Sequence, residues 1–225
     1  RPMWFALDGE KAEYEYSYNY QNWYPSVEYE TNNTLTNVGL YDLSPFSKFE
    51  IKSKKAHEDL QRICTSNIKQ EPGKCTYTHM LNKDGGIETD LTVVCVEQNH
   101  FRIISSAATR ERDKFHIKKH LSEGVELIDV TDDYCVFGLF GPKSRELMKT
   151  LSNNNFDNEE FKFGTAKYIQ INGINIWAQR LSYVGELGYE LYVKFNQSKK
   201  IYELLIEKGK NFNLSNCGMH AMDIM

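Results

Sequence analysis

Residues 77–93, YTHMLNKDGGIETDLTV, contain two extended segments joined by a tight polar turn. The Gly-Gly pair marks the turn, because glycine reaches the positive φ values that a sharp reversal needs. The segment after the turn alternates, which predicts that Ile87, Leu91 and Val93 share one face of a strand. Asp90 then lies on the other face. A carboxylate in so apolar a strand, just past a glycine turn, is a candidate pocket residue.

The overall composition is that of an ordinary globular chain. Its 225 residues suffice for one large domain or two small ones. The 27 basic and 31 acidic residues give a net charge of −4, without the basic stripe typical of nucleic-acid binding. The longest apolar stretch, residues 134–140, is far too short to cross a bilayer. We therefore expect neither nucleic acid nor a membrane as a partner.

No metal site is expected from the cysteines and histidines. The five cysteines are scattered and include no C-x-x-C, a pattern typical of reduced, buried thiols inside a cell rather than of a zinc site. His116 and His120 stand four residues apart in H-I-K-K-H. That stretch lacks the glutamate of the metalloprotease motif and includes two lysines, so we interpret it as a solvated helix face.

The two ends of the chain differ from its middle. Arg1–Asn33 is rich in Tyr and Trp and has little periodic patterning. We read it as an extended segment packed on another surface; an aromatic arm lying on its own domain is the alternative. The chain begins with Arg, and Met219–Met225 resembles the opening of a helix that is cut off. We therefore interpret the chain as a fragment.

Between these ends, predicted strands and helices alternate. Predicted strands are 47–51, 101–105, 134–140 and 189–193, predicted hairpins are 77–93 and 169–178, and predicted helices are 56–64, 108–121, 142–151 and 201–208. Pro142 suits the first position of its helix. Asn-Gly inside the second hairpin is the strongest short hairpin signal. Hairpins interleaved with helices indicate an α+β fold of mixed antiparallel sheets with flanking helices.

A second informative stretch is RLSYVGELGYE, residues 180–190. Gly185 and Gly188 bracket a turn that returns the chain into a strand, with Tyr183 on one side and Glu190 just inside the other. A tyrosine and a glutamate placed so can form an aromatic wall and an acceptor for a ring with N–H donors. The alternative is an ordinary turn with a packed tyrosine and a surface glutamate, and the residues alone leave both open.

Together, Y-T-x-M-L-N-x-x-G-G-x-E-x-D-L-T-V and R-L-S-Y-V-G-E-L-G-Y-E resemble the folate-binding aminomethyltransferases, the glycine-cleavage T-protein family. The resemblance is closer still to the C-terminal half of sarcosine and dimethylglycine dehydrogenases. It extends over nearly the whole chain. Further matching segments are Arg1–Phe5 (the exit from a flavin domain), Val38–Phe49 (a first core strand), Phe137–Pro142 (a strand-to-helix step) and Cys217–Asp223 (a helix leading into a third lobe).

The resemblance implies a cloverleaf of α+β lobes around tetrahydrofolate, here lacking the C-terminal barrel lobe. Asp90 matches the carboxylate beside the folate N5/N10 edge, Glu190 the acid that bonds the pterin, and Tyr183 an aromatic lining the same pocket. Ser106 stands at another folate-binding position, where glycine-cleavage enzymes have asparagine. Met222 replaces their arginine. Both departures favour the demethylating dehydrogenases.

The residue chemistry is compatible with that assignment. A folate amine attacks a one-carbon electrophile better if an acceptor takes its proton, and Asp90 in an apolar pocket, its pKa raised by burial, would suit this task. A pterin has an edge with N–H donors, and a carboxylate such as Glu190 can accept paired, charge-assisted hydrogen bonds from them.

The resemblance implies that residues 1–33 are an aromatic linker from a missing flavin domain. Residues 34–225 would then be an incomplete folate-binding domain. The FAD-dependent oxidoreductase domain upstream would oxidise an N-methyl group, and this chain would transfer the one-carbon unit to tetrahydrofolate. The alternative is a non-catalytic relative resembling the regulatory subunit of pyruvate dehydrogenase phosphatase. The compartment would be the mitochondrial matrix in a eukaryote and otherwise the cytoplasm. Sarcosine and dimethylglycine both remain open as substrates.

Overall fold

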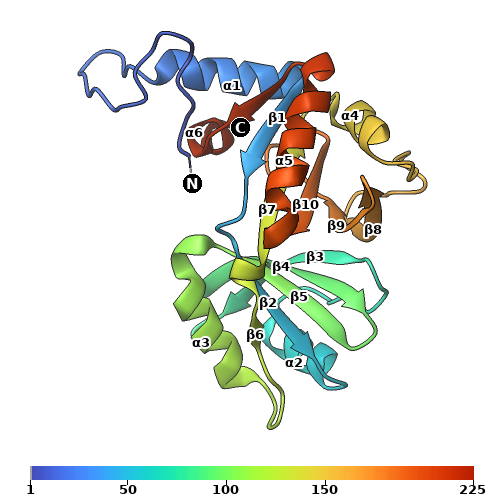
Figure 1. The fold of residues 1–225 in the computed structure, drawn as a ribbon. Coiled ribbons are helices and arrows are strands. Elements are labelled where there is room, and N and C mark those ends of the chain that lie inside the picture. The colour runs from blue at the N-terminus through green and yellow to red at the C-terminus, as the bar shows by residue number, and fades with distance from the viewer. Residues whose placement is uncertain (1) are drawn as a thin grey trace. The chain divides into compact units, whose positions relative to one another are not determined.

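The computed structural model describes residues 2–225, which form two compact units. Unit 1 comprises residues 2–44, Tyr134–Phe163 and Tyr168–Met225, and unit 2 comprises Pro45–Asp133 with Gly164–Lys167. Each unit is built on its own sheet with helices packed on it (Figure 1). The α+β class expected from the sequence is therefore confirmed.

Unit 1 is organised around a six-stranded sheet with the strand order β11-β1-β7-β10-β9-β8. β1 and β11 run parallel, whereas β7 is antiparallel to both β1 and β10, and β10 is antiparallel to β9. The strands are β1 (Val38–Asp42), β7 (Tyr134–Phe140), β8 (Thr165–Ile171, in unit 1 from Tyr168 onward), β9 (Ile174–Arg180), β10 (Gly188–Lys194) and β11 (Leu214–Cys217).

One face of this sheet carries the hydrophobic core of unit 1. The core joins alternate residues of the strands to α4 (Ser144–Leu151) and α5 (Phe195–Gly209), and α5 lies along the sheet in Figure 1. Its strand members include Leu139, Ala178 and Leu191. Because side chains alternate along a strand, the residues between them lie on the opposite face. That opposite face includes Glu190.

The N-terminal part of unit 1 differs from the sequence expectation. Tyr24–Thr36 forms helix α1, so the extended structure expected up to Asn33 is wrong from Tyr24 onward. Its buried stripe has helical spacing but is mostly polar, and it consists of Ser26, Val27, Glu30, Asn33 and Thr34. A polar stripe gives no apolar periodicity to detect.

Hydrogen bonds satisfy that polar stripe. The Glu30 carboxylate accepts from the backbone N–H groups of Phe5 at 2.6 Å and Gly218 at 2.8 Å. Gly218 precedes helix α6 (Met219–Ile224), where the sequence indicated the opening of a helix. Burial raises the pKa of the Glu30 carboxyl, and the two N–H groups oppose that rise.

The aromatic segment before α1 lies on its own unit, the second of the two alternatives for this region. The Tyr14 hydroxyl is 2.9 Å from Nε2 of His220, and the Trp23 ring is stacked with the His220 ring. Other tyrosines of the segment are exposed, Tyr18 completely so.

Unit 2 is built on a five-stranded antiparallel sheet with the order β3-β4-β5-β2-β6. Two α-helices and two 3₁₀ turns complete it. The elements are β2 (Ser47–Lys52), α2 (Ala56–Ile63), β3 (Cys75–Leu81), β4 (Ile87–Glu97), β5 (His100–Ser105), η1 (Ala107–Thr109), α3 (Arg110–His120), β6 (Ile128–Asp129) and η2 (Thr131–Asp133). Val38–Phe49 therefore contains two strands in two different sheets rather than a single core strand.

The hairpin predicted around the Gly-Gly turn is confirmed. Gly85 has φ of +83°, and the Asn82 side chain accepts from the backbone N–H groups of Asp84 and Gly86. Leu91 is buried as expected, but Ile87 is 66% exposed. Ile87 is the first residue of β4, beside the turn, where the core no longer covers the strand.

Other element boundaries shift by a few residues. The Asn172-Gly173 hairpin has both residues at positive φ, as its turn type requires. Helix α4 begins at Ser144, so the expectation of Pro142 at its first position is wrong; Ser144 N–H instead closes a turn onto the carbonyl of Gly141. The helix expected from residue 108 starts as the 3₁₀ turn η1, and α5 begins six residues before Ile201.

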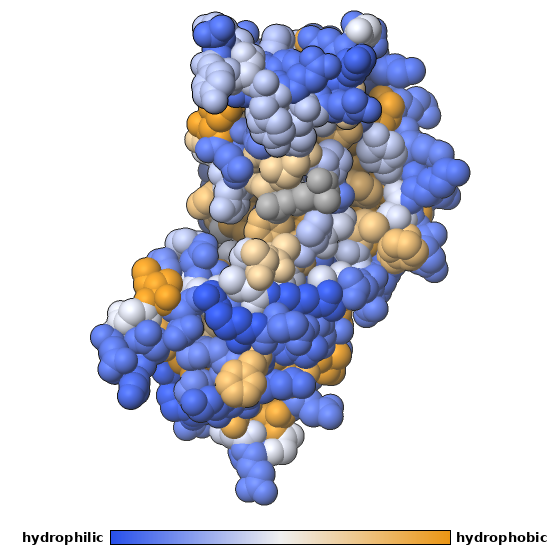
Figure 2. All heavy atoms as spheres, turned by 90° about the vertical axis from the view of Figure 1, so that its left-hand side faces the viewer, coloured by the Kyte–Doolittle hydropathy of each residue, from blue (hydrophilic) through white to orange (hydrophobic). Residues whose placement is uncertain are grey.

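The surface gives few further clues. The face drawn in Figure 2 is mostly hydrophilic, and its hydrophobic side chains gather in separate areas, a normal pattern for a folded domain. No helix among residues 2–225 is long and apolar enough to cross a membrane. In the same residues, no three His, Cys, Asp or Glu side chains are grouped so that they could hold a metal ion.

Candidate functional site

Glu190 lies in the middle of β10, flanked by β7 and β9. It pairs with Gly138 on one side and with Gln179 on the other. Directly opposite residues of antiparallel strands place their side chains on the same face, so Glu190 and Gln179 are side-by-side neighbours. The α4–α5 core occupies the other face. The sequence thus positions a carboxyl and an amide together, away from the core.

The environment of Glu190 favours its neutral form more than water does. Glu190 is partly buried, and burial raises the pKa of its carboxyl to about 7, an effect that a hydrogen bond from the Tyr192 hydroxyl opposes. That bond is 2.9 Å long and goes to Oε2. The carboxyl therefore changes charge near neutral pH, and its Oε1 has no hydrogen-bond donor among residues 2–225.

Tyr183 belongs to the turn between β9 and β10. Its side chain is 61% exposed, so it lies at the surface of unit 1. The same turn borders an open pocket of about 310 Å³ whose lining includes Phe163, Arg180 and Gly188. The Arg180 guanidinium bonds the Phe161 carbonyl at 2.5 Å, which ties the start of the turn to the preceding loop.

Asp90 lies in β4 of unit 2, on the face opposite the core. It pairs with His79, and Oδ2 accepts a hydrogen bond of 3.2 Å from the Tyr77 hydroxyl. The Tyr77 and His79 rings meet edge to face at 5.3 Å. Asp90 is exposed, so the expectation of a carboxylate enclosed in an apolar pocket is wrong. Alternation placed Asp90 on the correct face, but that face is polar and open around it.

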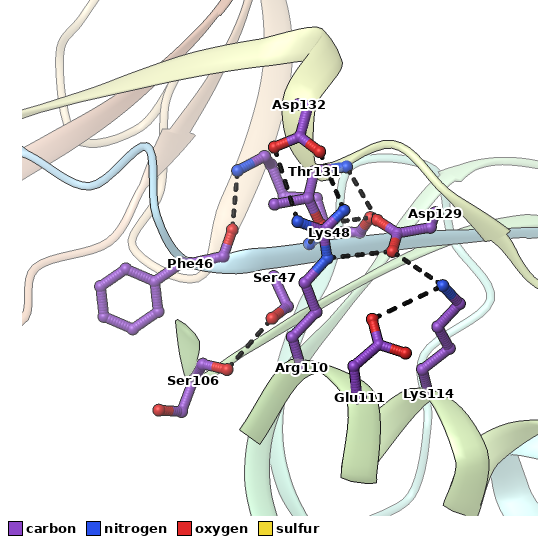
Figure 3. A network of polar contacts seen from close by, with 10 residues as sticks. All are labelled: Phe46, Ser47, Lys48, Ser106, Arg110, Glu111, Lys114, Asp129, Thr131 and Asp132. Carbon is purple, nitrogen blue, oxygen red and sulfur yellow. Dashed lines mark hydrogen bonds and ion pairs between the residues drawn. The ribbon is translucent and has the colours of Figure 1, made fainter. Parts of the chain in front are cut away.

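Ser106 follows β5, at the entry to η1 and α3. Its hydroxyl caps η1 by accepting from Ala108 N–H at 3.3 Å, and its carbonyl accepts from the Ser47 hydroxyl at 3.1 Å. Figure 3 shows Ser106 at the edge of a polar network in which Asp129 accepts from Arg110 and Lys114. The Ser106 hydroxyl takes no part in that network. Its clearest role is to start the helix.

Unit by unit, the structure brings the predicted residues together in pairs. In unit 2, Leu91 pairs with Ser105, so the adjacent residues Asp90 and Ser106 lie at the same end of the β4–β5 ladder. In unit 1, Tyr183 and Glu190 belong to one turn–strand segment.

Two neighbours of Glu190, Tyr192 and Gln179, were not predicted from the sequence. Tyr192 was detectable, because it stands two residues after Glu190 in a strand and must share its face. Gln179 was detectable in part. It alternates with Ile176 and Ala178 in β9, which places it off the core face, but its burial depends on tertiary packing.

Comparisons with known proteins agree with this architecture. The model of the GCVT N-terminal domain matches residues 1–225. The chain is 32% identical over 224 residues to a formaldehyde-forming 4-methylaminobutanoate oxidase of Paenarthrobacter nicotinovorans, covering 99% of this chain and 27% of that protein. It is 31% identical over 228 residues to mitochondrial dimethylglycine dehydrogenase of Rattus norvegicus, covering 100% of this chain and 26% of that protein.

A solved structure shows the same fold. The glycine cleavage system aminomethyltransferase T from Bartonella henselae superimposes with a TM-score of 0.76 at 20% identity, covering 94% of this chain and 57% of that one. The chain spans about a quarter of the length of the 4-methylaminobutanoate oxidase and of the dimethylglycine dehydrogenase.

Proposed function

Because the chain belongs to the GCVT N-terminal domain family, we propose that it binds tetrahydrofolate and transfers to it a one-carbon unit taken from an N-methylamine. The product would be 5,10-methylenetetrahydrofolate. The observation that carries the proposal is the Glu190 carboxyl, with a pKa of about 7 and an oxygen that accepts no hydrogen bond within residues 2–225.

Glu190 and its neighbours fit the pterin ring of folate. A pterin offers an N–H and an NH₂ group on one edge, and a carboxylate can accept from both. Such donors would stabilise the ionised form of Glu190, which burial disfavours in the free protein. The Tyr183 side chain is 61% exposed, and an exposed tyrosine ring can pack against an aromatic ligand.

Asp90 is the proposed proton acceptor. When bound, tetrahydrofolate supplies a secondary amine that takes up the one-carbon unit. Asp90 would accept the proton released from that amine, as a carboxylate positioned beside it can do. The Tyr77 hydroxyl holds one carboxylate oxygen and thereby orients the group. Ser106 would help to shape this region through η1 rather than by direct contact.

The source of the one-carbon unit lies outside this chain in the proposal. The two relatives described above are named for oxidation of methylated amino acids. We propose that an FAD-dependent oxidoreductase domain precedes the chain, with the aromatic N-terminal segment as the linker from it. In a eukaryote the compartment would be the mitochondrial matrix, and in a bacterium the cytoplasm.

The test uses the complete protein. It is titrated with tetrahydrofolate by anaerobic calorimetry and then assayed with sarcosine and with dimethylglycine, scoring formaldehyde and methylenetetrahydrofolate separately. The proposal requires saturable folate binding and a product shift toward methylenetetrahydrofolate when folate is present. Folate binding without demethylation would favour the non-catalytic, regulatory alternative, and no folate binding would refute the proposal.

A further inference from the structure

Gln179 in β9 is a buried amide without a partner. Its side chain is 0% exposed, and neither Oε1 nor Nε2 has a hydrogen-bond partner within residues 2–225. Leaving a buried amide unpaired costs free energy, and folded proteins leave few such groups. A buried amide with both polar atoms unpaired can therefore form hydrogen bonds with a ligand or with a water molecule.

The position of Gln179 determines which other groups a bound ligand would contact. Gln179 pairs directly with Glu190, so their Cβ atoms are about 4.5–5.5 Å apart on one face of the sheet. The neighbouring Ala178 points into the α4–α5 core, so that core cannot satisfy the Gln179 amide. On the far side of β10, the partner of Glu190 is Gly138, which has no side chain to offer. The carboxyl and the amide are thus adjacent on this face, and of the two only the carboxyl has a hydrogen-bond donor within residues 2–225, the Tyr192 hydroxyl.

We propose that Gln179 is a specificity-determining residue that binds the ring carbonyl next to the donors bound by Glu190. This inference rests on the proposed function. A carboxylate accepts from two N–H groups, and an amide NH₂ beside it donates to a carbonyl. The pair therefore complements a planar edge with the order donor, donor, acceptor. The 2-amino-4-oxo edge of a pterin has that order, through its NH₂ group, ring N–H and carbonyl oxygen.

The burial of Gln179 makes its contribution selective. A ligand that pairs the amide removes the cost of leaving it unpaired, whereas a ligand without the carbonyl leaves that cost in place. Gln179 should thus contribute to affinity and to discrimination, while contributing little to the stability of the free protein. A purely structural glutamine would do the reverse.

The experiment replaces Gln179 by methionine, which has nearly the same shape and no amide. In the complete protein, Gln179→Met should weaken tetrahydrofolate binding about 10- to 100-fold in calorimetry, without lowering the melting temperature of the free protein. Gln170→Met is the matched control, because Gln170 is an exposed residue of the adjacent strand β8 whose amide bonds Asn175. Its dissociation constant should equal that of the wild type.

The possible results separate cleanly. If Gln179→Met binds tetrahydrofolate as tightly as the wild type, water satisfies the amide and the inference is wrong. If wild-type protein does not bind tetrahydrofolate at all, the proposed function itself has failed. Should the methionine variant not fold, Gln179→Asn keeps an amide that falls one methylene short, and unchanged binding by that variant would overturn the inference equally.

Discussion

The Tyr192 hydroxyl donates a hydrogen bond of 2.9 Å to Oε2 of Glu190, two residues earlier on the same strand. Burial raises the pKa of the Glu190 carboxyl to about 7, and the hydrogen bond from Tyr192 limits that rise. The two residues together set the pH at which this part of unit 1 becomes negatively charged. Ligand binding through Glu190 should therefore depend on both burial and the Tyr192 hydrogen bond.

Folate affinity should depend on pH through Glu190. A ligand edge made of N–H donors prefers the carboxylate, which is the minor form below pH 7. Binding should therefore weaken by up to about tenfold per pH unit below 7 and level off above it. Calorimetric titrations between pH 5.5 and 8.5 measure this, with Glu190→Gln as the control that should show no such slope. A wild-type affinity independent of pH would contradict the assignment.

Tyr192→Phe should move that pH dependence upward. The variant removes the hydrogen bond that stabilises the carboxylate, so the pKa of Glu190 should rise further. The midpoint of the folate-binding profile should shift to higher pH, while affinity well above that midpoint changes less. Tyr202→Phe is a suitable control, since Tyr202 bonds Asn216 instead. An identical profile in wild type and Tyr192→Phe would show that the bond does not tune Glu190.

Asp90→Asn should uncouple oxidation from one-carbon capture in the complete protein. Asparagine keeps the shape but cannot take the proton from the attacking amine, and loss of a general base costs about 10²–10⁴-fold in that step. Formaldehyde should accumulate in place of methylenetetrahydrofolate while folate stays bound. Glu88→Gln, a change on the same strand, serves as control. An unchanged yield of methylenetetrahydrofolate from folded Asp90→Asn would rule out the catalytic role.

Unit 2 should lose stability in acid because of Glu50. Burial raises the pKa of this carboxyl, but hydrogen bonds from His100 and Arg102 outweigh that effect and lower the pKa to about 2. The stabilisation is present above the ordinary value of 4.5 and is lost as the pH falls from 4.5 toward 2. Its size is about 3 kcal/mol in the free energy of unfolding.

Urea unfolding at several pH values tests this prediction. Glu50→Gln should be less stable at pH 7 and should show a shallower acid dependence between pH 5 and 3 than the wild type. Glu97→Gln is the control, because Glu97 also faces His100 but is largely exposed. A Glu50→Gln variant with the full wild-type acid slope would show that other carboxyl groups are responsible.

Several elements of the fold were predictable because local signals and tertiary structure agree. The hairpins at Gly85 and at Asn172-Gly173 follow from turn residues that tolerate positive φ, and Tyr134–Phe140 is the strand β7 at the predicted bounds. Helix α1 was missed because its buried stripe is polar and depends on partners far along the chain, such as Gly218 for Glu30.

The candidate site was predictable only in part. Alternation places Asp90 and Glu190 off their core faces, as observed, because the period of two is a local property of strands. The exposure of Asp90 and the burial of Gln179 depend on what the rest of the chain covers. The spacing of residues in the sequence does not indicate which side chains other parts of the chain cover.

The most direct test of folate binding through Glu190 is calorimetry of tetrahydrofolate with Glu190→Gln at pH 8. Glutamine keeps the size of the side chain but offers one acceptor atom and no charge, so the dissociation constant should rise about 10- to 100-fold. The melting temperature of the free variant should not fall, since ionisation of the partly buried carboxyl costs stability above pH 7. A dissociation constant equal to that of the wild type would contradict the account and leave Glu190 as a residue of the strand alone.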